Sequence, residues 1–150
     1  MLIPLRNYSN YSICESNIKI DDLVDYASKN NLPAISLTDY KLLSGVLEFS
    51  VKCHNKGIQP IIGIDVDYVS SLGHVSRITL LSKTIKGFRN INILSTKINT
   101  ENDFVLNLEN IKQFSEDNIL ILGGLNSIFS EVIHNNRNFK KIGDDIYKLQ

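Results

Sequence analysis

Apolar residues recur at helical spacing near the start of the chain. Within residues 18–31, Ile20, Leu23, Val24 and Ala27 fall at positions i, i+3, i+4 and i+7, which form one apolar stripe on a helix. Acidic residues in the first turn of this segment suit the positive end of the helix dipole. The pattern therefore predicts an amphipathic helix over residues 18–31.

Short apolar runs bounded by polar and turn residues alternate with further helical patterns. In one of these patterns Val46, Phe49 and Cys53 share a face, and Gly57 suits the C-terminal cap. Strands are predicted over Leu2–Leu5, 34–39, 59–69, 77–82, 118–124 and 145–150. Helices are predicted over 18–31, 42–57, 107–117 and 126–135, and the segment 96–109 is expected to be irregular.

This alternation of strands and helices indicates an α/β fold. Strands joined through right-handed crossovers pair in parallel, so we expect a parallel sheet, open or closed into a barrel. The ligand sites of such sheets lie at the carboxyl ends of the strands. Because the pattern ends on a strand that has few neighbours, we expect residues 1–150 to be a piece of a longer chain.

Composition narrows the class of protein. The apolar share is 43%, and 16 Lys and Arg residues balance 16 Asp and Glu residues, so the formal net charge is zero. A domain that binds nucleic acid mainly through phosphates usually carries a basic excess, so we do not expect that role. With 2 cysteines and no apolar run of membrane-spanning length, we expect free thiols and a cytoplasmic protein.

The residues that follow the predicted strands carry the candidate chemistry. Those that we expect to converge on one rim are Arg6, Tyr8, Asp39, Tyr40, Asp65, Arg77, Gly123, Gly124 and Leu125. This set holds carboxylates and guanidinium groups but no histidine, whereas a catalytic metal centre needs several His and carboxylate ligands. The histidines His54, His74 and His134 do not pair at metal-binding spacing and are expected to be solvated or structural. The glycine pair is more typical of a strand exit than of a phosphate loop.

Several segments, in order, resemble the N-terminal polymerase-and-histidinol-phosphatase (PHP) domains of bacterial DNA polymerase III alpha subunits. They are LRNYSNYSICES, LPAISLTDYKLLSGVLEF, KGIQPIIGIDV, RITLLSKTIKGFRNINIL and NILILGGLNSIFSEVI. The resemblance implies that residues 1–150 are an N-terminal, incomplete portion of a distorted (β/α)7 barrel. It also implies that the chain is part of a much longer polymerase.

Active members of this family hold metal ions at the rim and hydrolyse phosphoesters, and their ligands begin with an H-x-H pair. The positions that match the family's ligand set by resemblance hold Arg6, Tyr8, Glu15, Asp39, Tyr40, Asp65, Arg77 and Leu125. Arg6 and Tyr8 stand where the H-x-H pair stands, ahead of SNYS, and Tyr40 replaces the histidine of T-D-H-G. Arginine, tyrosine and leucine are poor ligands for a hard divalent cation, so the resemblance implies a degenerate metal site.

Losing a cation would leave the negative charges in the cleft uncompensated, at a cost where they are buried. We hypothesise that Arg6 and Arg77 pair with Asp39 and Asp65 and so replace the charge of the cation. The alternative is that both arginines point into water, as surface arginines usually do.

The resemblance implies a non-catalytic PHP domain that supports the polymerase core of the same chain and docks the proofreading exonuclease subunit. No catalytic residue, metal or cofactor is expected within residues 1–150. The alternative is an active metal-dependent phosphoesterase or 3′–5′ exonuclease of the same fold, with Zn or Mn. The resemblance implies that the parent chain is a DNA-directed DNA polymerase, with Mg at an active site beyond residue 150, and that it meets DNA within its holoenzyme.

Overall fold

The computed structural model describes residues 2–71, 73–102, 104–124, 127, 144 and 147. The chain divides into two compact units, Met1–Asp65 and Val66–Gln150. Apart from Ser127, the predicted helix over 126–135 lies outside the described residues, as do Leu125 and His134. Of the predicted strand 145–150 only Tyr147 is described, and it is helical there, so the strand prediction is wrong at this residue. Within the described parts of the chain, no helix has both the length and the apolar content that crossing a membrane requires.

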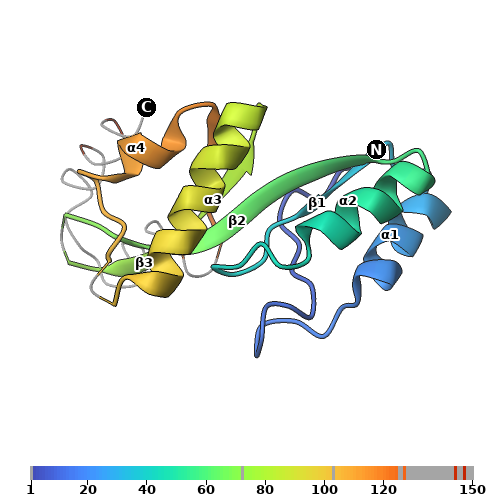
Figure 1. The fold of residues 1–150 in the computed structure, drawn as a ribbon, viewed down its shortest axis with the longest axis horizontal. Helices are drawn as coiled ribbons and strands as arrows, with labels where there is room; N and C mark the ends of the chain where they lie inside the picture. The colour runs from blue at the N-terminus through green and yellow to red at the C-terminus, as the bar shows by residue number, and fades with distance from the viewer. Residues whose placement is uncertain are drawn as a thin grey trace. The chain divides into compact units, whose positions relative to one another are not determined.

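The first unit contains two helices and a pair of parallel strands (Figure 1). Its elements are α1 (Ile20–Lys29), β1 (Ala34–Leu37), α2 (Val46–Asn55) and the beginning of β2 (Gln59–Val69). Strands β1 and β2 run parallel, with Ala34 opposite Gln59 and Leu37 opposite Ile62. Helix α1 packs against both α2 and β1. The predicted helices over 18–31 and 42–57 are confirmed within a few residues, and so are the parallel strands β1 and β2.

The core of the first unit is formed by the apolar stripes that the sequence predicts. Its members are Ile20, Leu23, Val24, Ala27, Leu32, Ile35, Leu37, Phe49, Cys53 and Ile58. Gly57 follows α2 with a φ of +66°, a left-handed conformation that costs glycine little. Both cysteines are free thiols, with Cys14 exposed and Cys53 buried.

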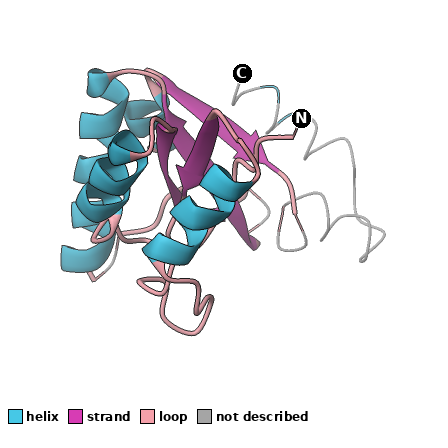
Figure 2. Ribbon diagram, turned by 90° about the vertical axis from the view of Figure 1, so that its right-hand side faces the viewer, coloured by secondary structure: helices cyan, strands magenta, loops and turns pink. Residues whose placement is uncertain are grey.

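The predicted strand Leu2–Leu5 is absent, and Figure 2 draws the described segment before α1 as loop. Pro4 has no backbone N–H, so it cannot donate to a strand ladder. The Asn7 side chain makes the nearby bonds instead: its Nδ2 donates to the carbonyl oxygens of Pro4 and Ser36, each at 3.2 Å. A side-chain amide therefore holds this segment beside β1 where a strand was expected.

The second unit contains the end of β2, then β3 (Val75–Ser82), α3 (Ile85–Thr100), α4 (Ile111–Ser115) and β4 (Asn118–Leu122). The strand order is β1-β2-β3-β4, and β2 belongs in part to each unit. Strand β4 pairs antiparallel with β3, with Ile78 opposite Leu122 and Ser82 opposite Asn118. The expectation of an all-parallel sheet is therefore wrong here, and β4, expected to be buried, has Ile119 50% exposed.

The reversed direction of β4 follows from the connection that precedes it. A single crossover helix returns the chain to the end of the sheet at which the previous strand began. The next strand then runs in the same direction, parallel to the previous one. Here α3 is followed by a loop and a second helix, α4, which bring Asn118 beside Ser82 at the far end of β3. The mixed sheet with helices still belongs to the predicted α/β class.

Helix α3 was not predicted, and it extends into the segment expected to be irregular. Thr84 caps it by accepting hydrogen bonds from the backbone N–H groups of Lys86 and Gly87, both at 3.2 Å. Its buried residues, Gly87, Ile91 and Leu94, form a narrow stripe at i, i+4 and i+7. Because the first of these positions is a glycine, the stripe contains only two large apolar residues, too few to predict a helix.

Candidate functional site

In the first unit, Arg6 and Tyr8 converge on one carboxylate oxygen of Asp65. Arg6 Nη2 lies 2.7 Å from Asp65 Oδ2 and forms an ion pair with it. The Tyr8 hydroxyl donates to the same Oδ2 at 2.5 Å and accepts a hydrogen bond from Arg6 Nε at 3.0 Å. The three side chains thus form a closed triangle of hydrogen bonds.

The backbone around Asp65 is fixed by β2 and by the end of β1. Asp65 N donates to the Asp39 carbonyl at 3.1 Å, and Lys41 N donates to the Asp65 carbonyl at 2.8 Å. These bonds form a single parallel β-bridge between Tyr40 and Asp65. The Asp65 side chain is 0% exposed, while that of Arg6 is 27% exposed. A buried carboxylate therefore meets a guanidinium group that reaches solvent.

The pKa values of both donors keep them in the protonated form at neutral pH. Burial, together with the hydrogen bond to the Asp65 carboxylate, raises the pKa of the Tyr8 phenol from 10.0 to about 12. Burial lowers the pKa of Arg6, but the hydrogen bond and the negative charge of Asp65 outweigh this and raise it overall. Tyr8 is therefore a neutral donor and Arg6 a fixed positive charge.

The second carboxylate, Asp39, is held by neutral donors and is 2% exposed. Its Oδ1 accepts hydrogen bonds from Ser9 N and from the Ser12 hydroxyl, both at 2.6 Å, and its Oδ2 accepts one from the Ser9 hydroxyl at 2.7 Å. The Ser12 hydroxyl also accepts a bond from Tyr40 N at 2.9 Å. Asp39 therefore ties the loop that contains Ser9 and Ser12 to the end of β1.

Successive residues from Arg6 to Ser9 bond alternately to Asp65 and to residues at or just after the end of β1. Arg6 and Tyr8 bind Asp65, while Asn7 bonds to Ser36 and Thr38 at the end of β1 and Ser9 binds Asp39. The segment is extended enough to keep the i, i+2 alternation of a strand, although it forms no ladder. The roles of Asn7, Ser9 and Ser12 were missed in the sequence. Ser9 and Ser12 belong to the motif SNYS, but their partner Asp39 lies 30 and 27 residues later in the chain, so the motif alone did not reveal it.

The remaining predicted site residues lie in different places. Glu15 is exposed in the loop before α1. The Tyr40 ring is stacked by Lys41, whose Nζ lies 4.7 Å from the ring centroid. Arg77 belongs to the second unit, and its Nε is 3.9 Å from Oδ1 of Asp67, an aspartate that the sequence analysis did not single out. Leu125 lies outside the described residues.

The charge-replacement hypothesis is confirmed in one of its parts. Arg6 pairs with Asp65, as hypothesised. Asp39 is held by serine hydroxyls and a backbone N–H group, and Arg77 lies within ion-pair distance of Asp67. Arg6 therefore compensates one carboxylate of the predicted rim, that of Asp65.

The residues at this site do not fit a divalent cation. The Arg6 guanidinium has no lone pair to offer, and the Tyr8 phenol remains protonated. Oδ2 of Asp65 already accepts hydrogen bonds from Arg6 and Tyr8. Among the described residues, no group of three or more His, Cys, Asp and Glu side chains is arranged to hold a metal ion.

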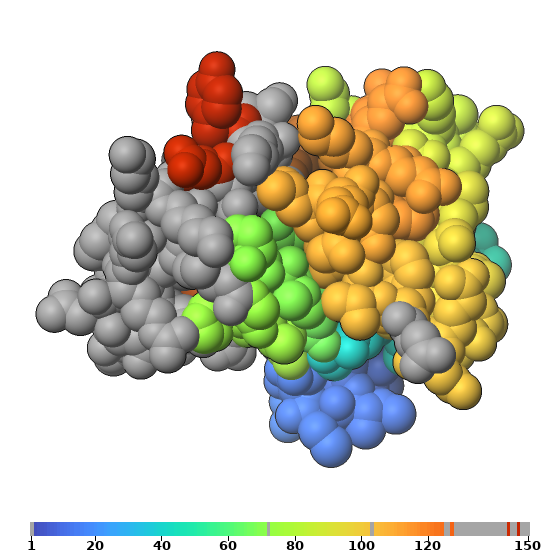
Figure 3. Space-filling model, turned by 90° about the vertical axis from the view of Figure 1, so that its left-hand side faces the viewer, coloured from blue at the N-terminus to red at the C-terminus, as the bar shows by residue number. Residues whose placement is uncertain are grey.

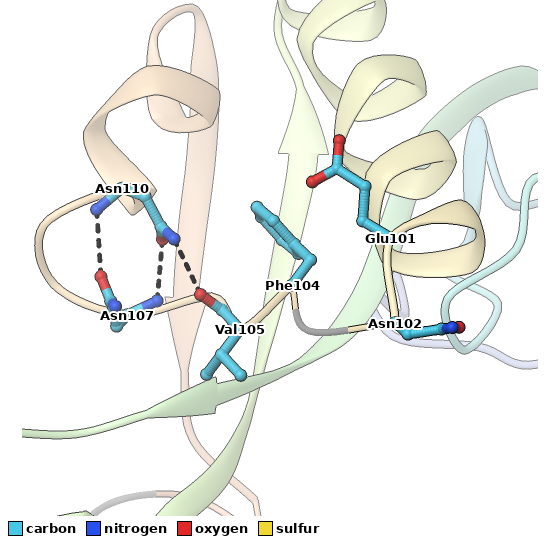
Figure 4. Close-up of a pocket in the computed structure, with 6 residues that line it drawn as sticks. All are labelled: Glu101, Asn102, Phe104, Val105, Asn107 and Asn110. Atoms are coloured by element: carbon cyan, nitrogen blue, oxygen red, sulfur yellow. Dashed lines mark hydrogen bonds between the residues drawn. The ribbon is translucent and has the colours of Figure 1, made fainter.

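The second unit contains a hollow of about 520 Å³ (Figure 4). It is lined by Glu101, Asn102, Phe104, Val105, Asn107 and Asn110. Asn107 and Asn110 accept hydrogen bonds from each other's backbone N–H groups, at 2.8 and 3.1 Å, and Asn110 Nδ2 donates to the Val105 carbonyl at 2.7 Å. In the space-filling view this region, drawn orange, adjoins α3 (Figure 3). Its asparagines serve the turn before α4, so we assign it no ligand.

Comparison with known proteins identifies relatives for nearly the whole chain. A family model described as "PHP domain" matches residues 4–150. The DNA polymerase III subunit alpha of Buchnera aphidicola is 36% identical over 140 residues, which are 89% of this chain and 12% of that protein. The subunit of the same name from Chlamydia pneumoniae is 32% identical and covers 86% of the chain and 12% of its own length. The chain thus spans about an eighth of these relatives.

Solved structures share the fold at low sequence identity. An amidohydrolase from Chromobacterium violaceum, with bound sulfate and no metal, matches with a TM-score of 0.53 at 21% identity and covers 74% of this chain and 36% of its own. A protein from Bifidobacterium adolescentis described as a metal-dependent phosphoesterase matches with a TM-score of 0.51 at 13% identity, over 75% of this chain and 43% of its own. These likenesses confirm the predicted fold class, a partial distorted barrel.

Proposed function

The chain belongs to the PHP domain family, and we propose that it is the N-terminal PHP domain of a replicative DNA polymerase III alpha subunit and is not itself catalytic. The match to alpha subunits over 89% of the chain supports the first part of this proposal. The contacts of Asp65 support the second part. A carboxylate that is bound by a guanidinium group and a protonated phenol is not available to position a metal-activated water.

In this proposal the domain has a structural role in a cytoplasmic replication enzyme. It supports the polymerase core of the same chain and presents a docking surface for the separate proofreading exonuclease subunit. Nucleotidyl transfer, with Mg, and most contacts to DNA belong to parts of the parent chain outside residues 1–150. The balanced charge of the domain supports this division, because 16 basic residues are matched by 16 acidic ones.

The competing function is an active phosphoesterase or 3′–5′ exonuclease that uses Zn or Mn. Isothermal titration of the purified chain with Mn²⁺ and with Zn²⁺ separates the two, together with an assay of phosphoester hydrolysis. We expect no stoichiometric binding and no metal-dependent hydrolysis. Tight binding of one or more equivalents, accompanied by hydrolysis that a chelator abolishes, would establish the competing function.

Docking of the exonuclease is tested in the full-length alpha subunit. We compare the complete subunit with one that lacks residues 1–150, and we measure capture of the purified exonuclease subunit from the same organism. We expect the deletion to abolish capture. The matched control is primer extension without the exonuclease, which shows whether the truncated polymerase remains folded. Undiminished capture by an active truncated subunit would refute the docking role.

A further inference from the structure

We propose that Arg6 is the built-in counter-ion of the buried Asp65, and that Arg6 and Tyr8 together do the structural work that a bound cation would do at this position. The inference deepens the proposed function and rests on its non-catalytic part. It concerns what holds the N-terminal segment onto β2. It assigns that task to two side chains that the resemblance places at the H-x-H positions of the family.

Arg6 and Tyr8 converge on one oxygen atom of Asp65. Arg6 Nη2 and the Tyr8 hydroxyl lie 2.7 and 2.5 Å from the same Asp65 oxygen, and Arg6 Nε lies 3.0 Å from the Tyr8 hydroxyl. A zinc ion would lie at about 2.0–2.2 Å from a carboxylate oxygen and would need lone pairs from the other two groups. The guanidinium of Arg6 and the phenol of Tyr8 instead direct an N–H and an O–H group at this oxygen. They therefore occupy the place that the ion would take, and they provide positive charge next to the carboxylate.

The positive charge of Arg6 compensates the negative charge of the buried Asp65. A fully buried carboxylate is costly unless it is paired and hydrogen-bonded. Asp65 is 0% exposed and is bonded to the fixed charge of Arg6, so that pair is neutral as a whole. The carboxylate of Asp39 instead accepts three hydrogen bonds from Ser9 and Ser12, so both of its oxygens have neutral donors. The two carboxylates of the rim are therefore accommodated by different means.

Arg6 and Tyr8 also join parts of the chain that are far apart in sequence. Arg6 and Tyr8 are 59 and 57 residues from Asp65 in sequence, and they lie in a segment that forms no strand. A bound metal joins ligands from distant segments in the same way. Here the hydrogen-bonded triangle makes the link, so the cohesion of the first unit should not depend on a metal.

A double-mutant cycle in the full chain tests the counter-ion role. Arg6→Gln leaves Asp65 buried without the guanidinium charge, and we expect the thermal midpoint to fall by roughly 10 °C. Asp65→Asn removes the charge that needs compensation. If the proposal holds, Asp65→Asn lowers the thermal midpoint much less in the Arg6→Gln variant than in the wild type. Arg6→Lys, which keeps the charge, is the matched control and should lower the midpoint less than Arg6→Gln. Strictly additive midpoints would overturn the proposal.

A gain-of-binding experiment tests whether the two side chains occupy ligand positions. In the Arg6→His/Tyr8→His variant two imidazoles face Asp65, a donor set that suits Zn²⁺ and Mn²⁺. We expect added Mn²⁺ or Zn²⁺ to raise the thermal midpoint of this variant by several degrees and to leave the wild type unchanged. The matched control is Arg89→His, at an exposed position of α3.

Two results of this experiment would overturn the proposal. One is an equal rise in the wild type, and the other is a folded double-histidine variant that shows no response to either ion. If that variant does not fold, the double-mutant cycle alone decides. Neither result bears on capture of the exonuclease, so this inference and the docking role can fail independently.

Discussion

The hydrogen bond that Tyr8 donates depends on the protonation state of its hydroxyl. It donates to Asp65 only while the phenol is neutral, and its pKa is raised from 10.0 to about 12. The folded state therefore holds this proton more tightly than the unfolded chain does. The stabilisation is complete below pH 10 and is lost as the pH rises through about 12.

We predict that Tyr8→Phe flattens the fall of the unfolding free energy between pH 10 and 12. At neutral pH the same variant loses about 1–3 kcal/mol, because Asp65 keeps one donor fewer in a buried site. Urea unfolding at a series of pH values measures both effects. The difference in phenolate absorbance between wild type and variant reports the pKa of Tyr8 itself. A Tyr8 pKa near its ordinary value would contradict the structure.

Ser9 and Ser12 hold the other carboxylate, and each hydroxyl has two partners. It donates to Asp39 and accepts from a backbone N–H group, that of Tyr11 for Ser9 and that of Tyr40 for Ser12. We predict that Ser9→Ala and Ser12→Ala each lower the unfolding free energy by about 1–3 kcal/mol, because Asp39 remains buried with fewer donors.

Chemical denaturation measures this loss. Asn17→Ala is the matched control, since it also truncates a polar side chain and Asn17 is exposed in the same loop. We expect the control to change the unfolding free energy by less than about 0.5 kcal/mol. Equal effects of all three substitutions would show that the Asp39 bonds do not stabilise the fold.

At the scale of elements, α3 depends on a close approach at Gly87. A Cβ atom at this position would lie 2.1 Å from the carbonyl oxygen of Asp117 and 2.5 Å from Asn118 Oδ1. Helix α3 can therefore approach the turn before β4 only because residue 87 has no side chain. This requirement also explains why the buried stripe of α3 lacks a large residue at its first position.

We predict that Gly87→Ala destabilises the second unit by about 1–3 kcal/mol, because the backbone must shift to admit the methyl group. Helix propensity alone predicts the opposite sign, a gain of about 1 kcal/mol. Asn92→Ala, at an exposed position of the same helix, is the control and should be close to neutral. Thermal unfolding followed by circular dichroism gives the sign directly. Stabilisation by Gly87→Ala would mean that α3 does not lie this close to Asp117.

At the scale of the whole molecule, charge balance predicts weak binding to DNA. Proteins bind duplex DNA non-specifically when Lys and Arg neutralise phosphates and release counterions. This chain carries 16 basic and 16 acidic residues, and several basic side chains are paired, as Lys52 is with Asp21 and Glu48. It therefore has little unbalanced positive charge to offer.

We predict no binding of a labelled DNA duplex by this chain at micromolar concentration and physiological salt, as measured by fluorescence anisotropy. The full-length alpha subunit is the positive control, because the proposed function places the DNA contacts in its other regions. Salt-dependent binding by residues 1–150 alone would instead assign this domain a direct role in holding DNA.

Much of the fold follows from local patterns in the sequence. The apolar stripe that begins at Ile20, the face shared by Phe49 and Cys53, and the turn at Gly57 are all set by residues close together in the chain. Helical periodicity and a left-handed glycine are short-range properties, so they are readable without a structure. The expectation that Arg6 and Tyr8 lie at one site came from their place after the first predicted strand and from the resemblance to the family's H-x-H pair.

Tertiary structure alone decided which partner each of these groups meets. Arg6 binds Asp65 across 59 residues of sequence, Arg77 pairs with Asp67, and β4 runs antiparallel to β3. Each outcome depends on strand order and on the path of the connections, and residue spacing does not encode either. The sequence shows which residues are charged. The partner that compensates each charge comes from a distant segment, so it is fixed only when these segments pack together.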